Sequence, residues 1–474
     1  MKKVGLRFGL LSASAAVAFL AVGAVSNAVS AQTLEEALAE AYLSNPTLQA
    51  QRAQVRATDE GVPQAKSGWR PNVELVADAG LLRSRARTRL SRTDSTRTTQ
   101  GIELQITQNV YNGGGTEAAV EGAKADVLTS RAELTSTEQS VLLQAVTAYM
   151  DVLRDTAVVD LNEQNVLRLQ RQLEATSDRY DAGVATLTDV AQAESRIARA
   201  RSDQLSAEGN LEVSRAVFEE IIGLAPANLS RPTLNPELPS GRDEAKSLAV
   251  QRNPSVLSAI YSRRSALHDI DSQYADLLPK VDIIGTASRD WEKTSEGSRN
   301  RNYQIAAQLT VPIYQQGFET SQVRGAKMTA AQAKMQIEAA RRDASEQALS
   351  AWETYRSVVA TITAIREEVR AAEIALEGVQ QEELVGQRTV LDVLDAEQEL
   401  LDARVSLVQA ERDETVARFE LIAAVGSLTA QDLALDVDIY DPSRHYDDVK
   451  DQWWGVGGEV EPHDSDASAR SVQP

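Results

Sequence analysis

The stretch VGQRTVLDVLDA, residues 385–396, decides the fold of this chain because the sequence carries a second version of it. That version, GVATLTDVAQAE, occupies residues 183–194 and agrees with the later one at six positions, all offset by 203 residues. The matched pairs are Gly183 with Gly386, Thr186 with Thr389, Asp189 with Asp392, Val190 with Val393, Ala193 with Ala396, and Glu194 with Glu397. In both versions a glycine precedes a threonine and an aspartate, which suit a helix start. Each version is therefore predicted to be a turn between two helices.

A second constant offset indicates that the duplication extends far beyond these turns. Asn45-Pro46 recurs as Asn253-Pro254, and Pro71 recurs as Pro279, so both offsets are 208 residues. Constant offsets over such distances indicate a tandem repeat with a unit of about 200 residues. The change from 208 to 203 requires five additional residues in the first copy. The segment from Arg83 to Thr98 is predicted to be the loop that holds them.

Long helices are predicted on both sides of each turn. Residues 116–181 and 319–385 contain no proline, and either segment could form a helix of about 100 Å at 1.5 Å per residue. A composition with 4% aromatic and 25% charged residues agrees, because it is typical of long helices rather than of a compact core. The returning helices are predicted at residues 187–222 and 390–425, and shorter opening helices at 33–61, with Thr33 as N-cap, and 243–277.

Two strands are predicted between the opening helix and the long helix of each copy. Apolar and polar residues alternate in residues 72–81 and 102–110, and again in 281–287 and 303–313. Segments of about ten residues with one apolar and one polar face are typical of strands between lipid and a wet lumen. A soluble antiparallel sheet with one wet face has the same pattern. The export signal described next favours the membrane interpretation.

The first 31 residues are predicted to be a cleaved signal peptide. Lys2 and Arg7 form a basic start, Leu10–Val25 is apolar, and Val29-Ser30-Ala31 supplies small residues before the cut. No later stretch approaches the roughly 20 apolar residues of a membrane helix, so a mature chain that enters a bilayer would have to use strands. The absence of cysteine excludes disulfides and a lipoprotein anchor. The net charge of −20 disfavours nucleic acid as a partner.

These observations predict a mainly α chain with a small β part and an internal two-fold repeat. The predicted segments are a signal peptide (1–31), a first repeat (32–225), a proline-rich linker (226–242), a second repeat (243–440) and a tail (441–474). The tail is predicted to be poorly ordered because it combines scattered acids with the run Gly455-Val456-Gly457-Gly458. Its Trp453-Trp454 pair suggests an alternative, in which the tail docks on the outside of the helices.

No catalytic or cofactor-binding chemistry is predicted. His268, His445 and His463 are isolated, and no metal-ligand spacing occurs. Gly113-Gly114-Gly115 lies between a strand and a helix but lacks the GxxxxGK[ST] and GxGxxG patterns of phosphate loops. It is better interpreted as a sharp strand-to-helix junction. We expect neither an enzyme nor a bound cofactor.

The export signal, the repeat, and the two strands and two long helices per copy resemble the TolC-like outer-membrane channel family, which includes outer membrane efflux and type I secretion proteins. The resemblance covers nearly all of residues 33–435, with the segment 83–98 and the tail outside it, and the stretch at 385–396 is its most specific part. It implies a trimer with a twelve-stranded β-barrel, four strands coming from each chain. A long α-helical periplasmic barrel of coiled coils would continue that barrel. Twelve is an even strand number within the range of outer-membrane barrels.

The implied function is that of an exit duct from an inner-membrane exporter across the periplasm and outer membrane, in type I protein secretion or multidrug efflux. The implied partners are two further copies of the chain, a periplasmic adaptor (membrane fusion) protein, an inner-membrane pump or ABC exporter, and outer membrane lipid. A second hypothesis stays open, a periplasmic coiled-coil adaptor or scaffold. Such a protein would share the coiled coils but not the amphipathic strands.

The helix-turn tips at Gly183 and Gly386 would form the periplasmic end of the duct. Asp392 and Asp395 are three residues apart and share one helix face. The spacing alone is also typical of a solvated helix start. The resemblance implies that both aspartates ring the periplasmic entrance and take part in a gate.

The resemblance also implies that Arg388 ties neighbouring coils together in the closed state. Its expected partners are Asp189 and Glu383. Glu383 stands where some family members have a tyrosine. Thr188 lies beside Asp189 in the first helical turn and completes the candidate gate.

Six arginines and one aspartate, Asp94, crowd the segment from Arg83 to Thr98. As an outer loop this segment could meet lipopolysaccharide phosphates, because arginine suits bidentate contacts with phosphate. A solvated loop with the same composition is an equal alternative.

Overall fold

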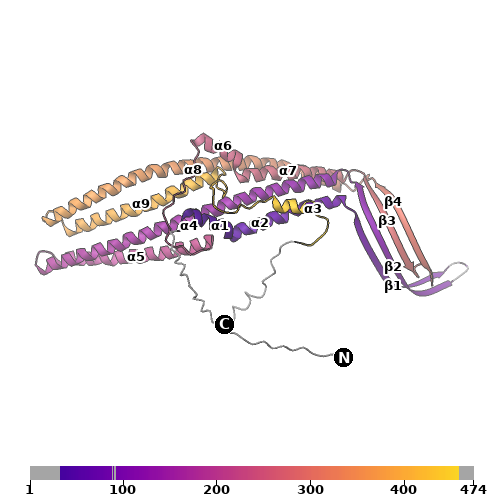
Figure 1. Ribbon diagram of the computed structural model, residues 1–474, viewed down its shortest axis with the longest axis horizontal. Coiled ribbons are helices and arrows are strands. Elements are labelled where there is room, and N and C mark those ends of the chain that lie inside the picture. The colour runs from indigo at the N-terminus through magenta and orange to yellow at the C-terminus, as the bar shows by residue number, and fades with distance from the viewer. Residues whose placement is uncertain (1–31, 88, 90–91, 458–474) are drawn as a thin grey trace, which may run out of the picture.

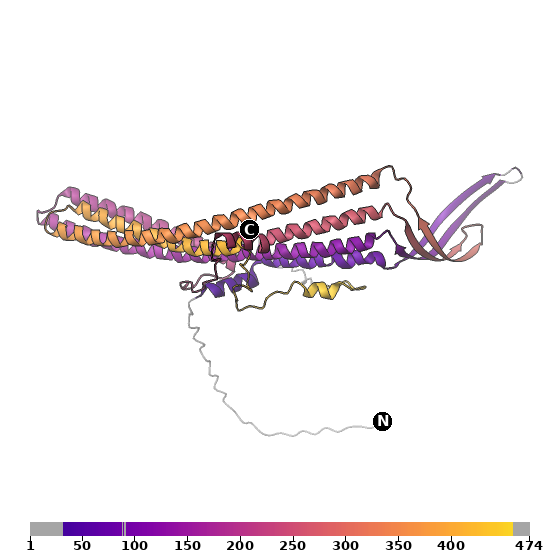
Figure 2. The same ribbon diagram turned by 90° about the horizontal axis from the view of Figure 1, so that it is seen from above.

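The computed structural model describes residues 32–87, 89 and 92–457, so the predicted signal peptide and residues 458–474 of the tail lie outside the described residues. The molecule is elongated, with helical hairpins at one end and a sheet at the other (Figure 1). Seen from above, the helices run along the same long axis and the sheet curves away from it (Figure 2).

The two copies contain equivalent elements in the same order. In the first copy these are α1 (Leu34–Ser44), α2 (Pro46–Asp59), α3 (Gly61–Lys66), the 3₁₀ turn η1 (Ser67–Trp69), β1 (Asn72–Arg87), β2 (Arg92–Tyr111), α4 (Gly115–Asp181) and α5 (Leu187–Ile222). In the second copy they are α6 (Arg242–Arg252), α7 (Pro254–Ala275), β3 (Lys280–Trp291), β4 (Arg299–Thr310), α8 (Phe318–Leu384) and α9 (Val390–Ala424). A short helix, α10 (Arg444–Val449), follows in the tail.

The opening segment of each copy is broken, where the sequence predicted one helix. The break falls at the repeated Asn-Pro pair. Pro46 occupies the first turn of α2, and Asn45 Oδ1 accepts hydrogen bonds from the backbone N–H groups of Thr47 (3.0 Å) and Leu48 (3.3 Å). Proline suits a first turn because it needs no N–H partner, and asparagine is a preferred N-cap. The prediction of Thr33 as the N-cap of α1 is confirmed, with Glu36 completing a capping box.

The four strands form one antiparallel sheet in the order β1-β2-β3-β4. The predicted loop from Arg83 to Thr98 is wrong over most of its length, because the ladder continues through Arg85 opposite Asp94 to Arg87 opposite Arg92. Asp94 Oδ2 lies 3.0 Å from Arg85 Nε, which offsets charge repulsion along this extension. The extra residues of the first copy therefore lengthen a hairpin, which reaches past β3 and β4 in Figure 2.

The sheet has two chemically distinct faces, because paired residues on adjacent strands point to the same side. The apolar face carries Val73, Leu75, Ala77, Leu81, Ile102, Leu104, Ile106, Ile283, Ala287, Tyr303, Ile305 and Leu309. The polar face carries Glu74, Asp78, Glu103, Gln105, Asp282, Thr286, Gln304 and Gln308. Ile305 is 85% exposed, so the apolar face is uncovered in the single chain.

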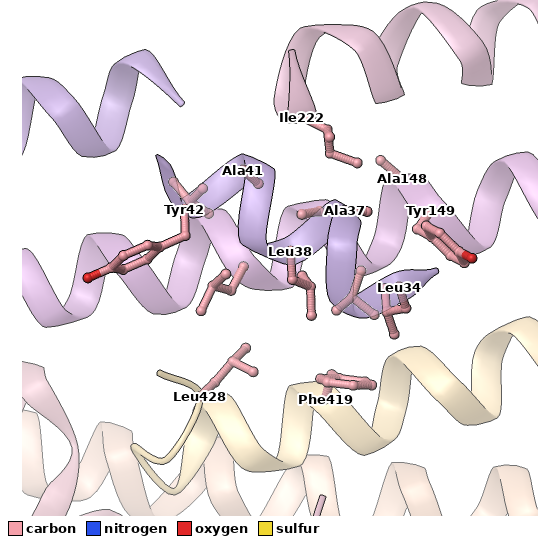
Figure 3. Close-up of a cluster of buried hydrophobic side chains, with 14 of the residues drawn as sticks. Leu34, Ala37, Leu38, Ala41, Tyr42, Ala148, Tyr149, Ile222, Phe419 and Leu428 are labelled. Atoms are coloured by element: carbon pink, nitrogen blue, oxygen red, sulfur yellow. The ribbon is translucent and has the colours of Figure 1, made fainter. Parts of the chain in front are cut away.

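The main hydrophobic core lies near the middle of the long axis, where both copies meet. Helix α1 packs against α4, and the large buried side chains around it come from α4, α5 and α9. Figure 3 shows Tyr149, Ile222, Phe419 and Leu428 around α1. The Tyr149 hydroxyl lies 2.7 Å from the carbonyl oxygen of Ser230, so the core also holds the segment that connects the two copies.

Part of the described tail contacts the helices, and Trp453 takes part in these contacts, whereas Trp454 and Val456 stay exposed. Helix α10 contacts α2, and the chain continues toward the start of β1. Lys66 Nζ lies 2.6 Å from Asp451 Oδ1, and Arg70 donates to the carbonyl oxygen of Gln452 (2.8 Å). The Arg70 guanidinium lies 4.8 Å from the ring centre of Trp453. Basic side chains of α3 and the following turn therefore hold residues 450–453 of the tail.

Among the described residues, no helix has a stretch long and apolar enough to pass through a membrane.

One carboxylate is buried where α2, α4 and the tail meet. Asp59 is fully buried, and neither oxygen accepts a hydrogen bond from another described residue. Arg131 Nη2 is 4.0 Å away. Burial raises the pKa of Asp59 to about 6, although the charges of Arg131 and His445 act in the opposite direction.

We predict that Asp59→Asn stabilises the chain at neutral pH. Because the folded-state pKa lies above the ordinary value of 3.8, the contribution of Asp59 to stability is complete below pH 3.8 and is lost as the pH rises through 6. The variant should gain up to about 3 kcal/mol in the free energy of unfolding at pH 7.5 and almost nothing at pH 4. Guanidinium unfolding at both pH values measures this, with Asp436→Asn at an exposed site as control. Equal effects at the two pH values would contradict the prediction.

Candidate functional site

The candidate site is the end of the molecule farthest from the sheet, where the two helical hairpins turn. Helix α4 returns as α5 around Gly183, and α8 returns as α9 around Gly386 (Figure 1). The backbone φ angles of these glycines are +78° and +76°, in the left-handed region that favours glycine. Both have open space around them, so the turns require glycine for its backbone and not for tight packing.

Each returning helix begins with a reciprocal capping box. Asp189 accepts a hydrogen bond from the backbone N–H of Thr186 (2.8 Å), and Thr186 Oγ1 accepts one from the N–H of Asp189 (3.2 Å). Asp392 and Thr389 repeat this arrangement at 2.8 and 3.3 Å. The pKa of both aspartates is lowered, first by the backbone N–H of the threonine and then by its hydroxyl, which also donates to the carboxylate at 2.8 Å. Asp189 and Asp392 therefore remain charged and hold the turns in shape.

Within one copy, Arg388 contacts neither Asp189 nor Glu383, so the predicted pairs stay predictions for contacts between copies. Its Nε donates to Glu382 Oε2 at 2.9 Å, and its Nη1 lies 4.0 Å from Asp392 Oδ1. The hydrogen bond to Glu382 raises the pKa of Arg388. Adjacent helical residues point about 100° apart, so Glu382 faces its own turn while Glu383 faces the other hairpin.

Near the tip, two ion pairs among the described residues join the hairpins of the two copies. Arg179 at the end of α4 binds Glu383 at the end of α8, with a second contact of 3.3 Å between Nη2 and Oε2. Arg196 on α5 binds Asp395 on α9. The structure therefore brings Glu383 and Asp395 into contacts that link the hairpins, and it uses Asp189 and Asp392 as caps. Thr188 is exposed in the first turn of α5.

The sequence interpretation missed both arginines of these pairs. A weak signal was available in the repeat, because the 203-residue offset matches Arg179 with Glu382 and Arg196 with Glu399. Charges of opposite sign at equivalent positions indicate that the two copies face each other. The actual partners lie one and four residues away from those positions, so the signal points to the interface but not to the pairs.

An apolar cluster supports the ion pairs slightly farther from the tip. It contains Val166 and Leu169 of α4, Ile197 and Ala200 of α5, and Val390 and Leu394 of α9. Glu397 is buried nearby with 6% of its surface exposed. Burial raises the pKa of Glu397, and the charge of Arg168 opposes the effect. The contact between the hairpins is thus small and includes a buried acid.

The arrangement offers interactions between helices rather than catalytic chemistry. Within residues 32–87, 89 and 92–457, no group of three or more His, Cys, Asp or Glu side chains could hold a metal ion. The aspartates and arginines described above form caps and ion pairs at the tip. What the site can do is hold the two hairpins together or release them.

Comparison with known proteins gives consistent matches over nearly the whole chain. The family model described as outer membrane efflux protein matches residues 37–224 and 246–427, the two copies of the repeat. The outer membrane efflux protein BepC of Brucella suis is 33% identical over 444 residues, which cover 93% of this chain and 96% of that protein. The outer membrane protein TolC of Vibrio cholerae is 27% identical over 427 residues, covering 88% and 96%.

A solved structure has the same fold. The CmeC outer membrane channel of Campylobacter jejuni matches with a TM-score of 0.76 at 14% identity, covering 88% of this chain and 89% of that one.

We predict that Arg196→Glu separates the two turns. The side chains of Arg196 and Asp395 are 31% and 58% exposed, so the pair contributes about 0–1 kcal/mol, and the variant adds repulsion between like charges. The chain has no cysteine, so spin labels at Val184→Cys and Val385→Cys report the distance between the turns alone. Electron–electron resonance should give a longer or broader distance distribution, measured with labelled chain diluted in unlabelled chain.

Two further variants test whether the effect belongs to this pair. Exchanging the charges, Arg196→Asp with Asp395→Arg, should restore the native distribution. Arg199→Glu is the matched control, because Arg199 pairs with Asp203 within α5 and does not reach the other hairpin. An equal change in the Arg199 variant would assign the effect to general charge instead.

Proposed function

The chain belongs to the outer membrane efflux protein family, and we propose that three copies of it assemble into one duct. As a member of this family it is an exit duct of the outer membrane, in the class of channels that serve efflux and type I secretion. It spans from the outer membrane into the periplasm. Its relatives are transport channels, and a periplasmic adaptor or scaffold is therefore not the best description of this chain.

The proposal of a trimer rests on the open edges of the sheet. Strands β1 and β4 are the edge strands, and each leaves one side of its backbone unpaired. Unpaired edges next to an exposed apolar face favour pairing with another chain. Pairing β4 of one copy with β1 of the next around a threefold axis gives twelve strands and no free edge. The apolar faces then point outward to lipid, and the polar faces line the passage.

The helices indicate where further partners would bind. Helices α4 and α8 have 67 residues each, so they extend about 100 Å from the sheet. We propose that their turns lie deep in the periplasm, where a periplasmic adaptor and an inner-membrane pump or ABC exporter deliver the cargo. The duct itself needs no catalytic group for this task, and we propose that it is not an enzyme.

We propose that the tip acts as the gate of the duct. Asp392 and Asp395, with Arg388, Asp189, Glu383 and Thr188, would surround the entrance in three copies. The links from Arg179 to Glu383 and from Arg196 to Asp395 support a closed state within each copy. When the hairpins separate, Asp395 loses its arginine and becomes a free charge at the entrance. Opening would thus make the entrance more negative.

The trimer is tested with the purified full-length protein. We expect it in the outer membrane fraction, dependent on detergent, with an unheated electrophoretic band that heating converts to the single-chain band. The reason is that edge pairing in a closed sheet resists detergent until heat breaks it. Recovery of a monomer that stays soluble without detergent would contradict the proposal.

The gate is tested with Asp392→Asn combined with Asp395→Asn. Asparagine keeps an oxygen that can cap the helix, so the turns should fold while a trimer loses six carboxylates. Charges in a constriction select ions, so the preference for cations in planar bilayers should fall toward none. The control removes two exposed aspartates near the middle of the molecule, Asp436→Asn with Asp438→Asn. Unchanged selectivity in the tip variant, with normal trimer yield, would contradict the assignment.

A further inference from the structure

The apolar face of the sheet ends in arginines on all four strands. Beyond Leu81, the next side chains of β1 on that face are arginines, and Arg289 and Arg301 form a pair on it in the second hairpin. These residues, here named the arginine girdle, are Arg83, Arg85, Arg87, Arg92, Arg289, Arg299 and Arg301. All of them are exposed.

The two faces of the sheet differ in their prevailing charge: the apolar face carries mostly arginines, whereas the polar face carries mostly acids together with Arg97 and Lys280. The polar face holds the acids Glu74, Asp78, Glu103, Asp282 and Asp290. Among the strand residues of the apolar face, the one acid is Asp94, which pairs with Arg85 at 3.0 Å and Arg83 at 3.5 Å. The girdle therefore remains strongly positive in a chain whose net charge is −20. Solvation alone would not favour the placement of most of these arginines on one face of the sheet.

The position of the girdle matches the edge of a lipid layer. Apolar side chains of β1 run from Val73 to Leu81, which is about 27 Å along a strand at about 3.4 Å per residue. The outward apolar band of outer-membrane strands is about 25 Å tall. Arg83 follows at once, at the depth where headgroups replace acyl chains. Trp291 supports this placement, because it lies beneath the Arg289 guanidinium at 4.8 Å and tryptophan favours such interfaces.

We propose that the arginine girdle binds the phosphate groups of anionic lipid headgroups in the outer leaflet of the outer membrane. The hairpin ends lie opposite the periplasmic helices, which assigns them to that leaflet. Arginine presents a planar fork of donors that fits phosphate oxygens, whereas lysine supplies only a point charge. The girdle would anchor the sheet at a fixed depth. The inference rests on the proposed trimer with its apolar faces toward lipid.

The test compares the native protein with Arg87→Gln combined with Arg92→Gln, two girdle residues that face each other across β1 and β2. Purified full-length protein in detergent is titrated with bis-phosphorylated lipid A, and binding is measured by native mass spectrometry. Loss of two arginines should weaken binding about 25-fold, from the usual contribution of a basic side chain at an anionic membrane surface. Dephosphorylated lipid A and inorganic phosphate should bind the native protein far more weakly than bis-phosphorylated lipid A.

A matched control removes two positive charges from the same end of the sheet but not from the girdle. Arg97 lies on the polar face and donates to the carbonyl oxygen of Lys293, so Arg97→Gln with Lys293→Gln should bind the lipid as the native protein does. Equal weakening in the control, or no weakening in the girdle variant, would overturn the proposal. Inorganic phosphate that binds as tightly as the lipid would also overturn it. The same spectra count the chains, so loss of the trimer is seen separately from loss of lipid binding.

Discussion

The structure depends on the need to cover two helices of 67 residues along their whole length. A helix of about 100 Å cannot bury its apolar positions against itself, and it folds stably only where neighbours supply an apolar surface. The 36 residues of α5 cover the half of α4 toward the tip. Helices α2, α3 and α7 cover the half toward the sheet. The opening helices of each copy are therefore required by the length of α4 and α8, and they bring the chain back to the point where the strands begin.

The hydrophobic core joins the two copies of the repeat into a single folded unit. Side chains from α1, α4, α5 and α9 meet around Tyr149 and Phe218, so the first and second copies share one interior near the middle of the long axis. Toward the tip the shared contact shrinks to one apolar cluster and two ion pairs. The coupling between the copies thus weakens from the core toward the tip, whereas toward the sheet α4 packs on α7 and β2 pairs with β3.

The sequence predicted most of the architecture because the repeat offsets and periodicities reflect backbone geometry. The long helices and the turns at Gly183 and Gly386 could be predicted from the absence of proline and the presence of capping residues. The Asn-Pro breaks were also visible in the sequence, although their consequence for the opening helices was not drawn. The hairpin beyond Arg83 was mistaken for a loop, because residues 83–87 and 92–98 are rich in arginine, serine and threonine and show no apolar alternation even though they pair.

The candidate site was less predictable, because its pairs depend on which helix faces meet. Glu382 and Glu383 point about 100° apart around the same helix, and Arg388 binds Glu382. The sequence alone does not show which of the two directions faces Arg388. The partners Arg179 and Arg196 lie about 200 residues from their acids. Docking of the tail was suggested only by its tryptophan pair, because its contacts with Lys66 and Arg70 cross nearly the whole chain and leave no local pattern.

The shared core acts mechanically as a fulcrum, and the hairpin that ends at Gly183 is its arm. From Ile222, buried in the core, helix α5 runs 36 residues to the tip, which gives an arm of about 54 Å at 1.5 Å per residue. A rotation of 5° about the core then moves the turn by about 5 Å, roughly one helical turn in length. Side chains at the fulcrum barely shift in such a motion, while the ion pairs at the tip are drawn fully apart. A small change in packing near Tyr149 would therefore be amplified into a displacement of the turn that is comparable to the diameter of a hydrated ion.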